Sequence, residues 1–132
     1  MKISQGKAKS SSLPLSCFTY AAGHGDEGVC LMMHLGKYRI LLDCGLTDLS
    51  PLLEQNQPPA DLIFCSHGHE DHCRGLLELH RAFPQIPIYT SEVTAKLLPC
   101  NWVGQLQGED LSWCQVLPWR STLKITDDLQ IE

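Results

Sequence analysis

The sequence feature that most constrains the fold is a short apolar run that leads directly into a cluster of metal-binding side chains. Residues 62–65 read LIFC, and residues 66–72, here called the histidine loop, read SHGHEDH. A short, continuously apolar run is typical of a strand that is buried on both faces. Three histidines and two acidic residues are therefore expected in a loop at the carboxyl end of a buried strand.

The chain before this run has the pattern of antiparallel β-structure. Residues 15–20, 29–35 and 38–42 are strand-like, and Gly36-Lys37 between the last two fits a tight hairpin. Residues 50–54 begin with Ser-Pro, which is typical of an N-cap followed by the first helical residue. A short connecting helix is predicted there.

After residue 60 the pattern alternates between strand and helix. The predicted elements are a strand at 61–65, a helix at 76–83, a strand at 86–90 and a helix at 92–98 that Ser91 can cap. Further short strands are expected between residues 113 and 131, with a turn at Asp127-Asp128. The fold class is therefore α/β (α+β), with a flexible tail over residues 1–14 and one domain, or part of one, over residues 15–132.

The composition is that of an ordinary globular chain, and it gives no sign of a basic surface that follows a phosphate backbone. Among 132 residues, 10 Lys and Arg against 15 Asp and Glu give a formal net charge of −5, with no basic run. The first residues are polar and lack the apolar segment of a secretory signal or membrane anchor. Seven cysteines occur without a C-x-x-C pair, which favours reduced thiols in a cytoplasmic protein over disulfides or a cysteine-zinc site.

The histidine loop has the residue types and spacing of a metal site. Alternate residues of an extended segment turn to the same side, so His67 and His69 can offer two ring nitrogens to one metal ion. Asp71 and His72 follow where the chain turns, and they can serve a second ion. A single loop histidine is usually only solvated, but half of the six histidines of the chain are gathered here.

Two metal ions about 3.5–4 Å apart can share and activate a hydroxide, which points to hydrolysis of a phosphodiester or acyl bond. Asp71 would then act both as a ligand and as an acceptor near the attacking water. Asp43, at the end of the strand-like run 38–42, has two interpretations. It is either an ordinary turn residue or a carboxylate that accepts a hydrogen bond from a ligating histidine, and the spacing alone leaves both open.

The motif H-x-H-x-D-H at residues 67–72, with LLDCG at residues 41–45, resembles the signature of the metallo-β-lactamase superfamily. It is most similar to the beta-CASP branch of RNA- and DNA-processing nucleases such as ribonuclease J. The resemblance implies an αββα sandwich with two zinc ions: His67 and His69 on the first, Asp71 and His72 on the second. It also implies that Asp43 supports these ligands, so Asp71 and Asp43 are the candidate catalytic residues. Manganese or iron would suit the same donors.

The resemblance stops before the family's later metal ligands. Relatives complete the site with a further histidine and a bridging aspartate, but no histidine follows His80. The chain thus resembles the N-terminal portion of a larger hydrolase, and by itself it is expected to bind metal weakly. A sheet edge or apolar face would stay uncovered, to be covered by the missing half, a complementing chain or a second copy.

The function expected from these observations is zinc-dependent cleavage of RNA phosphodiester bonds in the cytoplasm. The first alternative is a thioester or ester hydrolase of the glyoxalase II type. The second is a non-catalytic remnant that keeps the histidine loop without completing the site. These alternatives differ in whether the protein holds stoichiometric metal and in which bond it cleaves.

Overall fold

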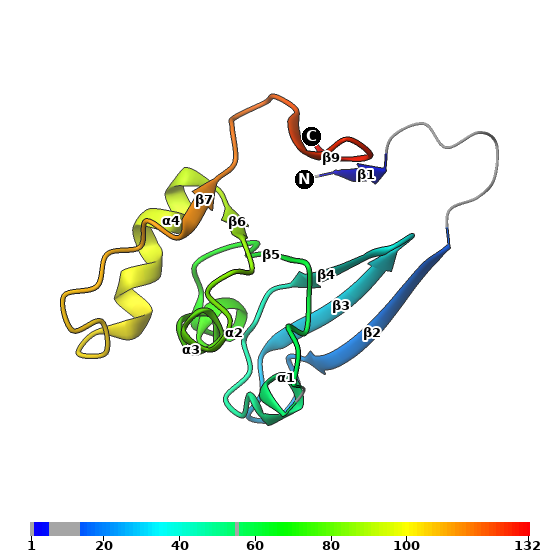
Figure 1. Ribbon diagram of the computed structural model, residues 1–132. Helices are drawn as coiled ribbons and strands as arrows, with labels where there is room; N and C mark the ends of the chain where they lie inside the picture. Colours follow the sequence, from blue (N-terminus) through cyan, green and yellow to red (C-terminus); the bar gives the residue numbers. More distant parts are fainter. Residues whose placement is uncertain (1, 6–13, 55) are drawn as a thin grey trace.

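The computed structural model describes residues 2–5, 14–54 and 56–132. Its main feature is a six-stranded sheet in the order β2-β3-β4-β5-β6-β7 (Figure 1). The first pairs, β2 with β3 and β3 with β4, are antiparallel, and β4, β5, β6 and β7 are mutually parallel. The strands are β2 (Leu15–Ala22), β3 (Val29–Leu35), β4 (Tyr38–Leu42), β5 (Leu62–Phe64), β6 (Ile88–Thr90) and β7 (Cys114–Val116).

Short helices cover one face of this sheet. They are α1 (Ser50–Leu53), α2 (Glu70–Cys73), α3 (Leu76–Ala82), α4 (Glu92–Leu97) and the 3-10 helix η1 (Leu98–Trp102). Leu52 of α1, Leu76 of α3 and Trp102 of η1 pack in one buried cluster with Leu41 and Ile63 of the sheet. The parallel connections place helices on this face, because a crossover between parallel strands must pass over the sheet.

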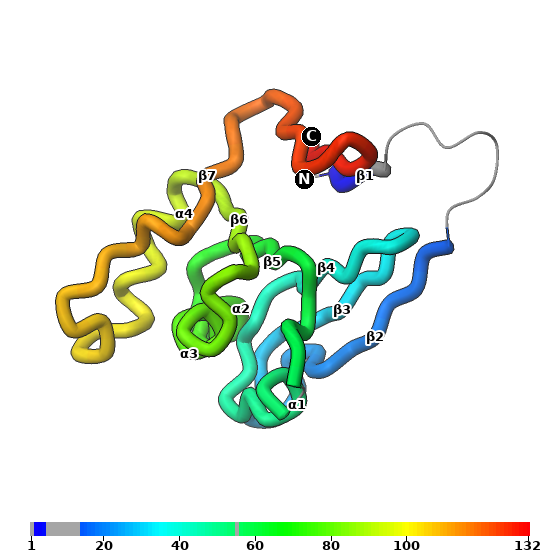
Figure 2. Tube along the Cα trace, in the orientation of Figure 1, coloured from blue at the N-terminus to red at the C-terminus, as the bar shows by residue number. Residues whose placement is uncertain are grey.

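A small antiparallel sheet lies against the opposite face. It has the order β1-β9-β8 and consists of β1 (Ile3–Gln5), β8 (Leu123–Thr126) and β9 (Leu129–Ile131). Leu129 and Ile131 pack against Ile40 and Phe64 of the large sheet. The two ends of the chain therefore lie side by side (Figure 2), and Lys2 and Glu132 exchange two backbone hydrogen bonds of 2.8 Å.

The alternation of side chains along the central strands divides the core between these two faces. Ile40 of β4 and Phe64 of β5 face the small sheet, whereas Leu41 and Ile63 face the helices. Successive side chains of a strand point to opposite faces, so a strand that is apolar at every position must be covered on both. The structure thus has a layer of helices, the large sheet and the small sheet, a mixed α/β fold as expected.

Most predicted elements are confirmed, with differences at their ends. The predicted strands at 29–35 and 38–42 match β3 and β4, and Gly36 turns between them with φ +57°. Ser91 caps α4 by accepting a hydrogen bond from the Thr94 amide. Ser50, predicted as an N-cap, lies inside α1, because Leu49 occupies the cap and Pro51 the second position.

Three segments adopt structure that the pattern did not predict. Within the predicted histidine loop, Glu70–Cys73 forms the short helix α2, with His69 at its N-cap. Ile3–Gln5, within the predicted tail, pairs with β9, while residues 1 and 6–13 of that tail lie outside the described residues. The segment is too short to signal a strand by its own pattern, and its partner lies at the far end of the sequence. After α4 the chain continues as η1 instead of stopping at Pro99, since proline is tolerated in a first helical turn.

The cysteines behave as small apolar residues. All seven are free thiols, and only Cys17 and Cys100 are exposed. The burial of the other five matches the expectation that cysteines in apolar runs serve as small apolar side chains. Within the described residues, no helix has both the length and the apolar character needed to cross a membrane.

The pH dependence of stability is expected to involve His80 on α3. Its ring stacks on Trp113 at 4.2 Å between centroids, and its buried Nδ1 has no hydrogen-bond partner among the described residues. Burial lowers the pKa of His80 below its ordinary value of 6.5; Glu109 opposes this shift, and Arg81 reinforces it. The folded state thus favours the neutral ring. The contribution of neutral His80 to the free energy of unfolding is complete above pH 6.5 and is lost as the pH falls through the lowered pKa.

Urea unfolding of the wild type and of His80→Phe at pH 7.5 and 5.5 tests this expectation. Phenylalanine keeps the stacking but cannot be protonated, so the variant should gain stability relative to the wild type on acidification. A difference in unfolding free energy that is equal at the two pH values would contradict it.

Candidate metal centre

The histidine loop and Asp43 lie at the carboxyl ends of two neighbouring parallel strands. Asp43 directly follows β4, and residues 65–69 lead from β5 into α2. The Asp43 amide donates to the Phe64 carbonyl at 2.7 Å, which extends the β4–β5 pairing to the edge of the sheet. This edge is where open parallel sheets usually bind their ligands.

Asp43 is a buried carboxylate that organises the histidine loop. Its Oδ1 accepts a hydrogen bond from the Ser66 amide at 2.6 Å, and its Oδ2 accepts one from the Ser66 hydroxyl at 2.7 Å. His72 Nδ1 lies 2.7 Å from the same Oδ2. Since an ionised carboxylate can only accept, the proton of this bond belongs to His72 Nδ1, which leaves Nε2 free as a metal ligand.

The backbone of Asp43 is in the left-handed region, with φ +61°. Aspartate enters this region more readily than most residues, because its short polar side chain can bond nearby backbone groups. The turn directs the side chain under the histidine loop. The interpretation of Asp43 as a carboxylate that bonds a metal-binding histidine therefore has the required geometry.

The side chains of the histidine loop converge. His67, His69 and Asp71 each offer one ligand atom, and these atoms lie within 4.8 Å of one another. The rings of His67 and His72 are 3.9 Å apart between centroids, and His72 Nε2 lies 3.6 Å from Asp71 Oδ2. All four predicted metal ligands are thus in one cluster at the end of β5.

This donor set fits a transition metal ion. Imidazole and carboxylate bind zinc at about 2.0–2.2 Å, and two histidines with one carboxylate and an open position are a known catalytic arrangement. Tetrahedral ligands lie about 3.4 Å apart, and the Asp71 side chain, 55% exposed, is free to make the small adjustment. His67 and His69 could hold one ion, and Asp71 and His72 could hold a second.

Two buried thiols lie beneath the loop. Burial, followed by the charge of Asp43, raises the pKa of Cys65; burial, followed by the charges of Asp43 and Asp71, raises the pKa of Cys73 to about 12. Both thiols are therefore protonated at neutral pH and serve as S–H donors. The Cys65 thiol donates to the His67 carbonyl at 3.3 Å, and the Cys73 thiol donates to the His69 carbonyl at 3.1 Å.

Two glycines allow α2 to approach the sheet closely. A Cβ atom at Gly45 would lie 1.8 Å from the Asp71 carbonyl oxygen, and one at Gly28 would lie 2.1 Å from it. The Gly28 amide also donates to the Gly45 carbonyl at 3.0 Å, so the three backbones are in direct contact. Any larger side chain would push Asp71 away from the sheet.

The residues of the metal cluster lie within a segment that matches a known protein family. The family model described as a beta-lactamase superfamily domain matches residues 38–132, which include Asp43 and the whole histidine loop. The chain belongs to the metallo-β-lactamase superfamily.

One relative covers nearly the whole chain of this metallo-β-lactamase superfamily member. The uncharacterized protein sll0514 of Synechocystis is 49% identical over 128 residues, which are 97% of this chain and 22% of that protein. The chain therefore spans about a fifth of the length of this relative.

Relatives with named activities match a shorter segment of about half the chain. Coenzyme F420H(2) oxidase of Methanothermobacter marburgensis is 38% identical over 73 residues, which are 54% of this chain and 18% of that protein. Probable RNase MJ4 of Methanocaldococcus jannaschii is 33% identical over 73 residues, 52% of this chain and 17% of that protein. Hydroxyacylglutathione hydrolase of Yersinia pestis is 32% identical over 74 residues, 54% of this chain and 29% of that protein. The superfamily is shared, but the activities differ.

A solved structure supports the fold. The metallo-beta-lactamase fold protein YhfI from Bacillus subtilis aligns with a TM-score of 0.55 at 19% identity, covering 92% of this chain and 47% of that one. The layered sheet with helices is thus a metallo-β-lactamase fold, as the H-x-H-x-D-H motif implied.

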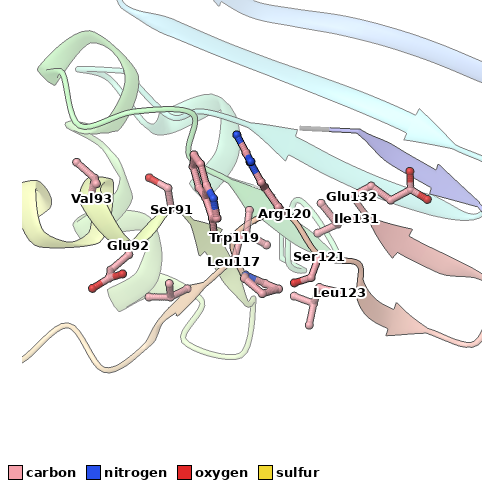
Figure 3. Close-up of a pocket in the computed structure, with 12 residues that line it drawn as sticks. Ser91, Glu92, Val93, Leu117, Trp119, Arg120, Ser121, Leu123, Ile131 and Glu132 are labelled. Atoms are coloured by element: carbon pink, nitrogen blue, oxygen red, sulfur yellow. The ribbon is translucent and has the colours of Figure 1, made fainter.

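A second feature of this superfamily member lies along the same edge of the sheet. A cavity of about 600 Å³ follows the carboxyl ends of β6 and β7, and it is lined by residues such as Val93, Leu117 and Trp119. Trp119 is 84% exposed, and the Arg120 guanidinium lies 5.5 Å from its ring centroid, so the two side chains extend together (Figure 3). The four loop ligands do not line this cavity, so it is separate from the metal cluster.

Ser66, Gly28 and Gly45 contribute to the site, although the sequence alone predicted no role for them. Ser66 directly precedes His67, so its place between a strand end and the motif was the available signal. Gly45 follows Asp43 by two residues, but nothing local indicates that it touches Asp71. Close backbone approaches become visible only when the segments are brought together.

Proposed function

We propose that this protein is a zinc-dependent hydrolase that cleaves RNA phosphodiester bonds. The observation that carries the proposal is the convergence of His67, His69 and Asp71 within 4.8 Å, with His72 beside them and oriented by Asp43. Zinc is the proposed metal because imidazole and carboxylate donors suit it, although manganese or iron would use the same donors. The proposed RNA partner and a cytoplasmic location remain predictions.

The residues of the metal cluster would have different roles in such a hydrolase. When bound, zinc ions lower the pKa of water and stabilise negative charge on an oxygen. The histidines hold the metal as neutral ligands, and Asp43 keeps His72 in the tautomer that leaves Nε2 available. The exposed Asp71 carboxylate can orient an attacking water and accept its proton.

Two observations favour RNA as the substrate. About half the chain is 33% identical to a probable RNase. An exposed tryptophan beside an arginine suits a base stacked on the ring and a phosphate bound by the guanidinium, and Trp119 and Arg120 form such a pair. Because the net charge is −5, general attraction to RNA is weak, and binding would depend on local groups of this kind.

The second candidate function is hydrolysis of a glutathione thioester. It is favoured by the 32% identity to hydroxyacylglutathione hydrolase over a segment of similar length. Both reactions need a metal-activated water, so the metal cluster serves either one. The third reading, a remnant without activity, predicts that the folded protein holds no metal.

Because the chain by itself is expected to bind metal weakly, zinc is added in excess. We then expect the protein to bind zinc in equilibrium dialysis and to cleave end-labelled single-stranded RNA in a reaction that EDTA stops. His67→Ala and Asp71→Ala should each reduce cleavage by more than about 100-fold, because each removes a metal ligand. His34→Ala, at an exposed position on β3, is the matched control and should cleave as the wild type does.

A hydroxyacylglutathione thioester is assayed in parallel. Hydrolysis of the thioester without cleavage of RNA would replace the nuclease by the second candidate. Bound zinc with cleavage that neither His67→Ala nor Asp71→Ala affects would contradict the mechanism. A folded protein that binds none of the added zinc would favour the remnant.

A further inference from the structure

The backbone carbonyls of the H-x-H segment are all hydrogen-bonded to side chains. The His67 carbonyl accepts from the Cys65 thiol at 3.3 Å, the Gly68 carbonyl from Asn101 Nδ2 at 3.0 Å, and the His69 carbonyl from the Cys73 thiol at 3.1 Å. The His72 amide adds a second bond to the His69 carbonyl at 2.9 Å. Each peptide group of the segment that carries the two metal-binding imidazoles is thus held by a separate donor.

The donors come from three different elements of the fold. Cys65 follows β5 and Cys73 ends α2, and both are buried, with exposed fractions of 4% and 0%. Asn101 belongs to η1, which follows α4 and the parallel strand β6. The segment is therefore anchored both to its own strand and helix and to the next strand–helix unit along the sheet.

The orientation of Asn101 is determined by its surroundings. Its Nδ2 also lies 3.3 Å from the Leu98 carbonyl. Both neighbours of this atom are acceptors, so the nitrogen, and not the oxygen, must face them. The Asn101 amide nitrogen must therefore be the atom that donates to the Gly68 carbonyl.

Fixing these carbonyls has a consequence for the imidazoles. Gly68 gives the segment a flexible centre, since glycine has more backbone freedom than any other residue. Holding the peptide planes on both sides of Gly68 removes that freedom. His67 and His69 flank Gly68, so a fixed backbone also fixes where their side chains begin, and their ligand atoms lie within 4.8 Å of one another and of Asp71.

We propose that Asn101, Cys65 and Cys73 are positioning residues. Their side chains hold the backbone of the H-x-H segment so that the imidazoles of His67 and His69 converge before a metal ion binds. The part that concerns metal affinity rests on the proposed function. The part that concerns the order of the loop does not, because it is argued from the hydrogen bonds of these three side chains alone. Preorganised ligands lose less conformational entropy on binding, so the metal affinity rises.

The test is Asn101→Asp, which has nearly the same shape but places an acceptor where the donor was. In the metal-free protein, ¹⁵N relaxation of the Gly68 and His69 amides should show greater motion in the variant. Zinc affinity, measured by competition with a chromophoric chelator, should fall by about 10–100-fold, the range for residues that orient metal ligands. The absorption bands of bound Co²⁺ should broaden or shift, because the two imidazoles are held less uniformly.

Two further variants separate positioning from a general effect on the fold. Gln105→Glu makes the same amide-to-carboxylate change at an exposed position near the end of η1 and should match the wild type in all three measurements. Cys73→Ser keeps a donor to the His69 carbonyl and should retain the order of the loop, whereas Cys73→Ala should reduce it. Far-ultraviolet circular dichroism checks that each variant is folded.

The outcomes distinguish this inference from the proposed function. Unchanged relaxation and unchanged zinc affinity in folded Asn101→Asp would overturn the positioning role. If the loop moves more in the variant but neither the variant nor the wild type binds zinc, the positioning role would be supported and the metal-dependent function overturned. Greater motion together with weaker zinc binding would support both.

Discussion

Gly45→Ala is expected to destabilise the fold by more than about 3 kcal/mol and to displace Asp71 from the metal cluster. The added Cβ would lie 1.8 Å from the Asp71 carbonyl oxygen and 2.4 Å from its carbonyl carbon. Real Cβ atoms do not approach backbone atoms so closely, and neither group is the flexible end of a side chain. The turn after β4 or helix α2 must therefore move.

Urea unfolding followed by circular dichroism measures this effect. Gly104→Ala is the matched control, because a Cβ there meets open space and only the positive φ of 79° is unfavourable. The control should cost about 1–2 kcal/mol, the usual cost of a left-handed backbone for an L-residue. Equal unfolding midpoints for the two variants would show that α2 does not need this close approach.

Asp43→Asn is expected to reduce metal affinity by about 10–100-fold with little change in shape. In the wild type, Oδ2 of Asp43 accepts from the Ser66 hydroxyl and from His72 Nδ1. In the variant, Oδ1 can still accept from the Ser66 amide, but an NH₂ group replaces Oδ2 and must donate. His72 Nδ1 must then act as the acceptor, which moves the ring proton to Nε2 and blocks the nitrogen that faces Asp71.

Two measurements test this tautomer change. Zinc affinity is obtained by chelator competition, and the ¹⁵N chemical shifts of the His72 ring report which nitrogen carries the proton. Asp127→Asn, at a fully exposed turn, makes the same chemical change away from the loop and should bind zinc as the wild type does. If Asp43→Asn kept both the tautomer and the zinc affinity of the wild type, Asp43 would have no part in orienting His72.

The predicted elements that the structure confirms are those with a strong local signal. β3 and β4 follow from alternating or continuous apolar runs, and α4 follows from Ser91 as a cap before an amphipathic segment. The apolar run before the histidine loop predicted a strand covered on both faces, and all three residues of β5 are buried. Local spacing also indicated that His67, His69, Asp71 and His72 could converge, because they lie within six residues.

Other features have no local signal. β1 is three residues long and becomes a strand only because β9 lies beside it. Asn101 lies 33 residues from Gly68 in the sequence, and nothing near it suggests that its amide would reach the histidine loop. Ser66 was part of the motif, but its two bonds to Asp43 depend on the pairing of β4 with β5.

The sequence by itself determined the superfamily, the α/β character of the chain and the residue types of the metal cluster, because strand periodicity and ligand spacing act over a few neighbouring residues. The tertiary structure alone decided what holds that cluster in place: the carboxylate of Asp43 beneath His72, the glycines that admit α2, and the amide of Asn101 on the Gly68 carbonyl. These contacts join residues 26 to 43 positions apart, and they form only when parallel strands bring their carboxyl ends to one edge of the sheet.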